Sequence, residues 1–190
     1  MPSITIPVDV LKAALAVIPK HEIRFYLNGL HINAQGRWLE ATDGLIALRI
    51  PLPFEPPVGM GNVIVSRAVV EQMVDAAKAD GSRIITLRQE GSKLYRTNVG
   101  AHDVVFGAVS AQFPDLDRVF TPGRVAPPAD MRPYCLEAKQ IDKWFKVQRM
   151  MFKTAYLHDG DEPPAQCGAG YLFKRNDVQC VIASCRERTS

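Results

Sequence analysis

Lysine and arginine side chains recur along residues 138–153 at a spacing typical of one helix face. At about 100° per residue, that face carries Lys139, Lys143, Lys146, Arg149 and Lys153. The opposite face is apolar and holds Ile141, Trp144, Phe145 and Phe152. Ammonium and guanidinium groups bind phosphate, so the pattern predicts contact with a nucleic-acid backbone. A solvated face is the alternative, although such faces usually mix charges and this one has only Asp142 to offset the cations.

Other residues with reactive or metal-binding side chains give no comparable pattern. The four cysteines, Cys135, Cys167, Cys180 and Cys185, form no C-x-x-C pair and have no neighbouring histidine, which favours free buried thiols. The acidic run Asp159-Gly160-Asp161-Glu162 lacks EF-hand spacing and is followed at once by two prolines, so a solvated loop is expected. With no nucleophile elbow or phosphate-cradling loop either, we expect no catalysis, no metal and no cofactor.

Composition places the chain among ordinary globular proteins. It has 190 residues, of which 47% are hydrophobic and 23% charged, and a formal net charge of +3. No apolar run approaches the ~18 residues of a membrane span, and the N-terminus lacks the basic and apolar regions of a signal peptide. A cytoplasmic protein without membrane contact is therefore expected.

Hydrophobic periodicity predicts one unit, strand-helix-three strands, three times along the chain. In the first copy Ile4-Thr5-Ile6 is a strand, a helix follows that Pro19 ends, and strands follow near 25–34, 37–43 and 45–52. The second has a strand at 63–65, a helix capped by Ser66, and strands near 83–89, 93–99 and 102–109. The third has a strand at 134–136, a helix at 138–150, and strands near 152–158, 170–175 and 179–185.

Proline-rich linkers separate the three copies. The second linker, residues 121–128, breaks the pattern more completely than the first, at residues 51–57. We therefore expect one domain of two units at residues 1–125 and a half-domain at residues 126–190.

Three segments resemble, in order, the middle domain of the bacterial DNA sliding clamp, the β subunit of the replicative DNA polymerase. Residues 24–29, R-F-Y-L-N-G, resemble the family's R-Y-Y-L-N-G, and residues 63–67, V-I-V-S-R, resemble its V-I-V-P-R. Residues 113–119, F-P-D-L-D-R-V, resemble its F-P-D-Y-R-R-V. More faintly, residues 181–186 stand where clamps end in V-M-P-M-R-L.

This resemblance implies an α+β, DNA-clamp-like fold of one complete clamp domain plus a half-domain. In the family, each domain contains two such units, and rings of two three-domain subunits encircle duplex DNA with helices lining the hole. The chain matches the middle domain and half of the last, so the usual two-subunit ring is not expected from it.

The resemblance also implies two sets of site residues. The loop near DNA would include Arg24, Phe25 and Tyr26, in addition to the five basic residues of the predicted helix. The partner-peptide pocket of clamps would correspond to Leu27, Thr42, Gly44, Leu45, Ala47, Val119 and Ala183. Leu45-Ile46-Ala47 replaces the family's H-R-L, however, and Ala183-Ser184-Cys185 replaces M-P-M. Asp43-Gly44 also has a simpler interpretation as a tight hairpin turn, and Phe25-Tyr26 as core aromatics.

The function implied is that of a clamp-like protein, with a phage or other mobile element as an expected source. It would bind duplex DNA without sequence specificity and tether a DNA polymerase or another clamp-binding protein. The alternative is an interaction module that decoys or inhibits a host polymerase or clamp without holding DNA. A remnant acting only as a structural subunit is a third hypothesis.

A homo-oligomer is expected because the third unit has no sister within the chain. Its sheet edge and apolar helix face would then be uncovered, and the same unit of a second chain could cover them in a twofold dimer. A tetrameric ring is the larger alternative.

Overall fold

The first two units close on each other by exchanging their first strands. The computed structural model describes residues 2–53, 55–121, 136–155, 165–167 and 170–183. Strand β1 (Ser3–Pro7) pairs with β6 (Ile84–Gln89) of the second unit, with Ile4 opposite Leu87. In return, β5 (Val63–Ser66) pairs with β2 (Gly29–Asn33) of the first unit. Each unit thus covers an edge of its neighbour's sheet, which joins the two into one body.

The strands form two antiparallel sheets. One has the order β1-β6-β7-β8 and includes β7 (Leu94–Val99) and β8 (His102–Gly107). The other has the order β5-β2-β3-β4-β11-β10-β9. Its remaining strands are β3 (Trp38–Thr42), β4 (Ile46–Pro51), β9 (Ala165–Cys167), β10 (Gly170–Arg175) and β11 (Val178–Ala183). The pairing of β4 with β11 continues the first unit's sheet into the third unit.

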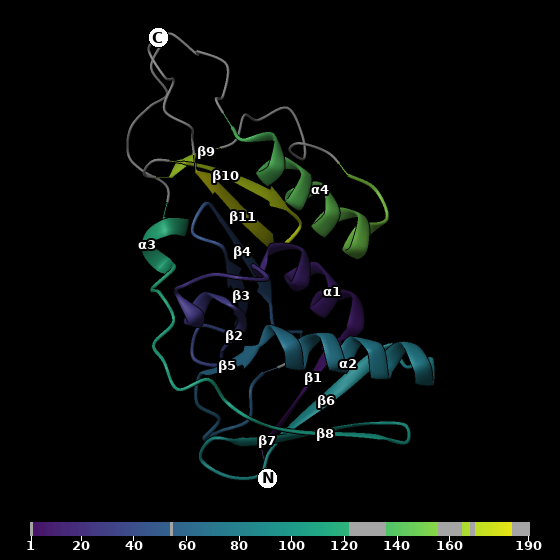
Figure 1. The fold of residues 1–190 in the computed structure, drawn as a ribbon. Helices are drawn as coiled ribbons and strands as arrows, with labels where there is room; N and C mark the ends of the chain where they lie inside the picture. The colour runs from purple at the N-terminus through teal and green to yellow at the C-terminus, as the bar shows by residue number, and fades with distance from the viewer. Residues whose placement is uncertain (1, 54, 122–135, 156–164, 168–169, 184–190) are drawn as a thin grey trace, which may run out of the picture.

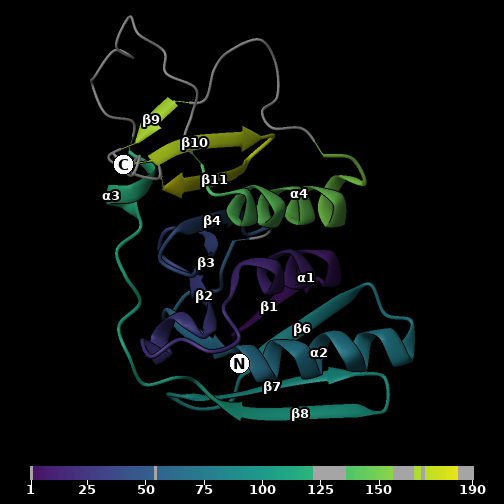
Figure 2. The same ribbon diagram turned by 45° about the horizontal axis from the view of Figure 1, so that its top comes forward.

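Three long helices lie on one side of the sheets, with α1 (Val8–Val17) between α4 (Ala138–Phe152) and α2 (Arg67–Asp80) (Figures 1 and 2). The Ser66 hydroxyl accepts a hydrogen bond from the backbone N–H of Val69 at 3.5 Å, so it caps α2 as the sequence predicts. Gly81, in the left-handed region at φ +74°, ends the same helix. Two short helices, η1 (Phe25–Leu27) and α3 (Asp117–Phe120), lie away from this layer.

One hydrophobic core runs through all three units. It includes the buried stripe of α1, which carries Leu11 and Ala14, and the fully buried Trp144 and Val147 of α4. Helix α1 packs directly against α4 over the β4–β11 junction. The expectation of an uncovered third unit is therefore wrong, because the first unit covers the apolar face of α4 and pairs with β11.

Several local expectations also differ from the structure. Residues 152–155 are not a strand, since α4 continues to Phe152 and its final apolar side chain packs against the core. Residues 25–27 form a 3₁₀ turn before β2 begins. The thiol of Cys180 is buried, as expected. The boundary at residue 125, the acidic run at 159–162, Cys135 and Cys185 lie outside the described residues.

Within the described ranges, no helix combines the length and the apolar character needed to cross a membrane. The same part of the chain contains no group of three or more histidine, cysteine or acidic side chains that could hold a metal ion.

Replacing Trp144 by alanine should strongly destabilise the protein, because its indole fills the space between α4, α1 and the sheet. We expect the free energy of unfolding to fall by about 3–5 kcal/mol, the range for large aromatic truncations in cores. Urea denaturation followed by circular dichroism measures this change. Met150→Ala, on the partly exposed side of the same helix, is the control and should change the value by less than about 0.5 kcal/mol. Equal effects of the two substitutions would contradict the packing described.

Candidate functional site

A cavity of about 400 Å³ opens where the β4–β11 junction meets η1 and α3. All seven residues expected in a partner pocket line it: Leu27, Thr42, Gly44, Leu45, Ala47, Val119 and Ala183. The lining also includes Arg24, Tyr26, Ile46, Pro114, Leu116, Arg118, Gly170 and Val181. Segments from both ends of the chain therefore build one mostly apolar cavity. Its use by a partner peptide stays a prediction.

The turn between β3 and β4 forms one rim of the cavity. The Asp43 carboxylate accepts hydrogen bonds from the backbone N–H groups of Leu45 at 2.8 Å and Ile46 at 2.9 Å. The Thr42 hydroxyl accepts from the N–H of Gly44 and donates to the carbonyl of Ile46. Gly44 has φ +92°, a conformation that favours glycine. The dipeptide Asp43-Gly44 is therefore a tight turn, as its simpler interpretation states, and it also places Gly44 in the cavity wall.

Asp43 connects this rim to helix α4. Its carboxylate forms an ion pair with the Lys143 ammonium, and both side chains are largely buried, with 11% and 17% exposed. Burial alone would raise the pKa of Asp43, but the hydrogen bonds from Lys143 and from the N–H groups of Ile46 and Leu45 outweigh it and lower the pKa. On the other side, the Arg24 guanidinium donates to the Asp43 carbonyl at 3.4 Å.

A buried polar network anchors α3, which forms the opposite wall. The Glu40 carboxylate contacts His31 Nδ1 at 2.8 Å and accepts from Arg49 Nε at 2.6 Å. Arg49 also donates to Asp117 at 2.6 Å, and its guanidinium lies 4.7 Å from the ring centre of Phe120. Arg49 therefore joins β4 to α3, which presents Arg118 and Val119 to the cavity.

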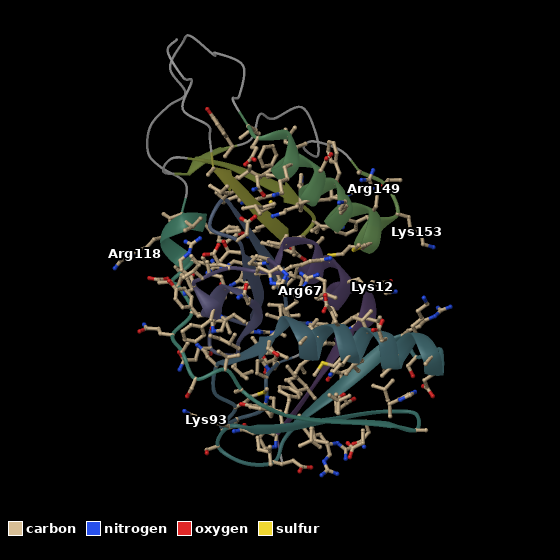
Figure 3. All side chains as sticks on the ribbon, viewed as in Figure 1. Lys12, Arg67, Lys93, Arg118, Arg149 and Lys153 are labelled. Atoms are coloured by element: carbon tan, nitrogen blue, oxygen red, sulfur yellow. The ribbon has the colours of Figure 1, made fainter. Side chains whose placement is uncertain are left out.

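The basic side of α4 is mostly exposed. Lys139, Lys146, Arg149 and Lys153 are exposed, as the sequence predicts. The expectation that Lys143 is also exposed is wrong, because the buried carboxylate of Asp43 draws its ammonium group inward. No ion pair within the described residues neutralises Lys146 or Arg149. Figure 3 shows Arg149, Lys153 and Lys12 of α1 on the helix side of the molecule, with Arg118 and Lys93 at its opposite edge.

The expected DNA loop lies at the cavity. Arg24 and Tyr26 line it, Tyr26 packs against the apolar cluster beneath, and Phe25 stays outside the lining with 59% of its surface exposed. Arg24 forms a hydrogen bond with Glu22, which raises the pKa of Arg24. The core-aromatic interpretation therefore fits Tyr26 better than Phe25. DNA contact by these three residues stays a prediction.

Sequence reasoning missed several lining residues that stand close in sequence to residues it named. Pro114, Leu116 and Arg118 belong to the same short segment as Val119. Val181 lies two positions before Ala183 in a strand, and this spacing places both side chains on one face. Gly170 had no such signal, because only its pairing opposite Ala183 brings it to the cavity.

Solved structures provide the comparison that decides the fold. The DNA polymerase III β subunit of Thermotoga maritima superposes with a TM-score of 0.66 at 15% identity, covering 97% of this chain and 64% of that one. The sliding clamp of Bartonella birtlesii bound to griselimycin gives 0.67 at 16%, with 97% and 66% covered. The polymerase III β subunit of Caulobacter crescentus gives 0.62 at 17%, with 97% and 65% covered.

The chain has the DNA sliding-clamp fold. Identities this low establish the fold alone, and the chain spans less than two thirds of the length of these three clamps. The α+β, clamp-like fold class inferred from the sequence is therefore confirmed. A scan against protein families and a search of characterised proteins found no match.

Glu40→Gln should make the stability of the protein less dependent on pH. Burial alone would raise the pKa of Glu40, but hydrogen bonds from His31 and Arg49 outweigh it and lower the pKa. A lowered pKa stabilises the fold above the unfolded value of about 4.3, and this stabilisation is lost as pH falls through the folded value.

We expect the variant to lose about 2 kcal/mol near pH 7 and the difference to shrink below about pH 4. Besides His31 and Arg49, the groups facing Glu40 are Asn33 and, through Arg49, Asp117. Urea titrations at a series of pH values measure the effect. Glu55→Gln, at a carboxylate with 82% of its side chain exposed, is the control. A constant difference between wild type and Glu40→Gln at every pH would contradict the interpretation.

Proposed function

We propose that the protein is a clamp-like DNA-associated protein that contacts duplex DNA through its helix layer and holds a partner peptide in the cavity at the β4–β11 junction. The cavity is the observation that supports the proposal most strongly. Residues named from the clamp resemblance, although distant in sequence, meet around a single opening large enough for apolar side chains. Residues 1–125 would form the complete domain and residues 126–190 the half-domain.

The proposed DNA contact is electrostatic. Arg149 and Lys153 lie on the same side of the molecule as Lys12 (Figure 3), and phosphate contact through such groups carries no sequence information. Lys143 is left out of this contact because Asp43 neutralises it. In helix α2 the acidic residues outnumber the basic ones by three to two, so α4 contributes most of the proposed attraction.

The proposed partner contact is an apolar peptide with acidic neighbours. Leu27, Ala47 and Val181 supply an apolar floor, while Arg24 and Arg118 stand at the cavity with 49% and 88% of their side chains exposed. Leucine or phenylalanine side chains would fill the cavity, and aspartate or glutamate beside them would pair with the two arginines.

The DNA contact predicts that charge reversal on α4 weakens duplex binding. Lys146→Glu with Arg149→Glu should lower affinity and reduce the slope of log affinity against log salt by about two units, because each lost phosphate contact removes about 0.9. Fluorescence anisotropy of a labelled 30-base-pair duplex between 50 and 200 mM salt, conditions in which such slopes are resolved, measures both quantities.

Lys93→Glu with Arg118→Glu makes the same change in charge at the opposite edge of the molecule and serves as the matched control. The DNA proposal fails if wild type has no duplex affinity at 50 mM salt or if both double variants bind equally. Peptide binding without duplex affinity would favour the decoy or inhibitor function instead.

The partner contact predicts that a carboxylate at the cavity rim blocks binding. The probe is a fluorescein-labelled Glu-Leu-Asp-Leu-Phe peptide, which combines apolar anchors with acidic neighbours. Leu45→Asp should weaken its binding at least tenfold, or about 1.4 kcal/mol, because the new charge would be desolvated by the apolar peptide. Val58→Asp replaces a fully exposed apolar residue outside the cavity and should leave affinity unchanged. Equal affinities of the two variants would place the peptide elsewhere.

A further inference from the structure

Strands β4, β8 and β11 are equivalent, because each is the last strand of its unit and pairs antiparallel with the strand that precedes it in the chain. Two of them already pair with each other. β4 and β11 run antiparallel with Leu48 opposite Cys180 and Ala47 opposite Val181, and their helices α1 and α4 pack side by side above them. This junction joins two units of the same kind through equivalent edges.

The third last strand, β8, has no such neighbour in the described part of the chain. It pairs with β7 on one side and ends the four-stranded sheet on the other. The strand contains no proline or lysine to block edge pairing, and Val105 is 46% exposed near its middle. Asp103, its one acidic residue, is paired with Arg96 at 3.4 Å within the sheet.

The helix above β8 leaves matching space. A groove of about 610 Å³ lies between α2 and β8, lined by Ala76, Ala79, Val104 and Val105 with Asp75 and His102 among its polar residues. At the β4–β11 junction, the corresponding position over the strand pair is occupied by the neighbouring unit's helix. The second unit therefore presents a free strand edge at β8 and an open groove beside α2, the two features that the β4–β11 junction fills in the other units.

We propose that β8 is a subunit interface at which a second copy of the chain adds its own β8 in antiparallel register about a twofold axis. An antiparallel pair of identical strands is self-complementary, so one edge serves both copies. Opposed residues of such a pair point to the same face, so the twofold axis must pass through a residue pair of one kind. The proposed register sets Val105 opposite Val105, because Val105 is exposed whereas Val104 packs against the chain's own core. Helix α2 of each copy would then fill the groove of the other.

This interface differs from a dimer through residues 131–190, because the face of α4 is already covered by α1. The interface would also extend the helix layer from one chain to two. If the new junction repeats the geometry of β4 and β11, the layers of the two copies join on one side and their basic residues are doubled. The proposal stands without DNA binding, since it concerns the free protein.

The first measurement is the mass of the full chain by sedimentation velocity and light scattering at micromolar concentration. We expect twice the chain mass of 21.0 kDa for wild type. Val105→Lys should give a folded monomer, because two ammonium groups would meet at the centre of the strand pair. Ile84→Lys introduces the same charge at a 58% exposed residue of the same sheet, in β6 between β1 and β7, and should remain dimeric.

Hydrogen exchange locates the contact independently of mass. Backbone amides of β8 should exchange more slowly as wild-type concentration rises, and this dependence should vanish in Val105→Lys while the amides of β4 and β11 are unchanged. A monomeric wild type would overturn the proposal. So would a dimer that persists in Val105→Lys, or one whose concentration-dependent protection lies outside β8 and α2.

Discussion

The antiparallel pairing of β4 with β11 is the contact on which the rest of the structure depends. It extends the first unit's sheet into the third unit and sets α4 against α1, which buries Trp144 completely. The same pairing brings Val181, Ala183 and Gly170 to the turn that follows β3. Without it, the third unit would expose an apolar helix face, and the cavity would lose the wall supplied by the C-terminal strands.

Charge compensation connects the cavity with the helix layer. The carboxylate of Asp43 shapes the turn through two backbone N–H groups and also holds the ammonium of Lys143, while the backbone of the same residue accepts a hydrogen bond from Arg24. A buried carboxylate requires such partners, since an unpaired charge in this position would be strongly destabilising. One acidic residue therefore positions the cavity rim and withdraws one lysine from the exposed basic face of α4. On the opposite wall, Arg49 plays the corresponding part by joining buried Glu40 to Asp117 of α3.

Features governed by local periodicity and capping could be predicted from the sequence. The amphipathic pattern located α1, α2 and α4, and Ser66 was recognised as the cap of α2 because its hydroxyl acts on a neighbour three residues away. Alternation of apolar and polar residues located the hairpins. The apolar pattern along α4 also distinguished the buried Trp144 from the exposed Lys146 and Arg149. Among these local features, the errors lie at segment ends, as at residues 152–155, where periodicity over a few residues does not distinguish a helix end from a strand.

By itself, the sequence determined which side chains are apolar, which helix face is basic, and that three similar units follow one another. Tertiary structure decided how those units meet. The exchange of β1 and β5, the pairing of β4 with β11 and the burial of Lys143 join residues far apart in the chain, and no local propensity encodes such partners. Lys143 illustrates the reason. Its place on the helix wheel matched that of Lys146, yet the carboxylate that buries it is attached to a turn 100 residues away in sequence.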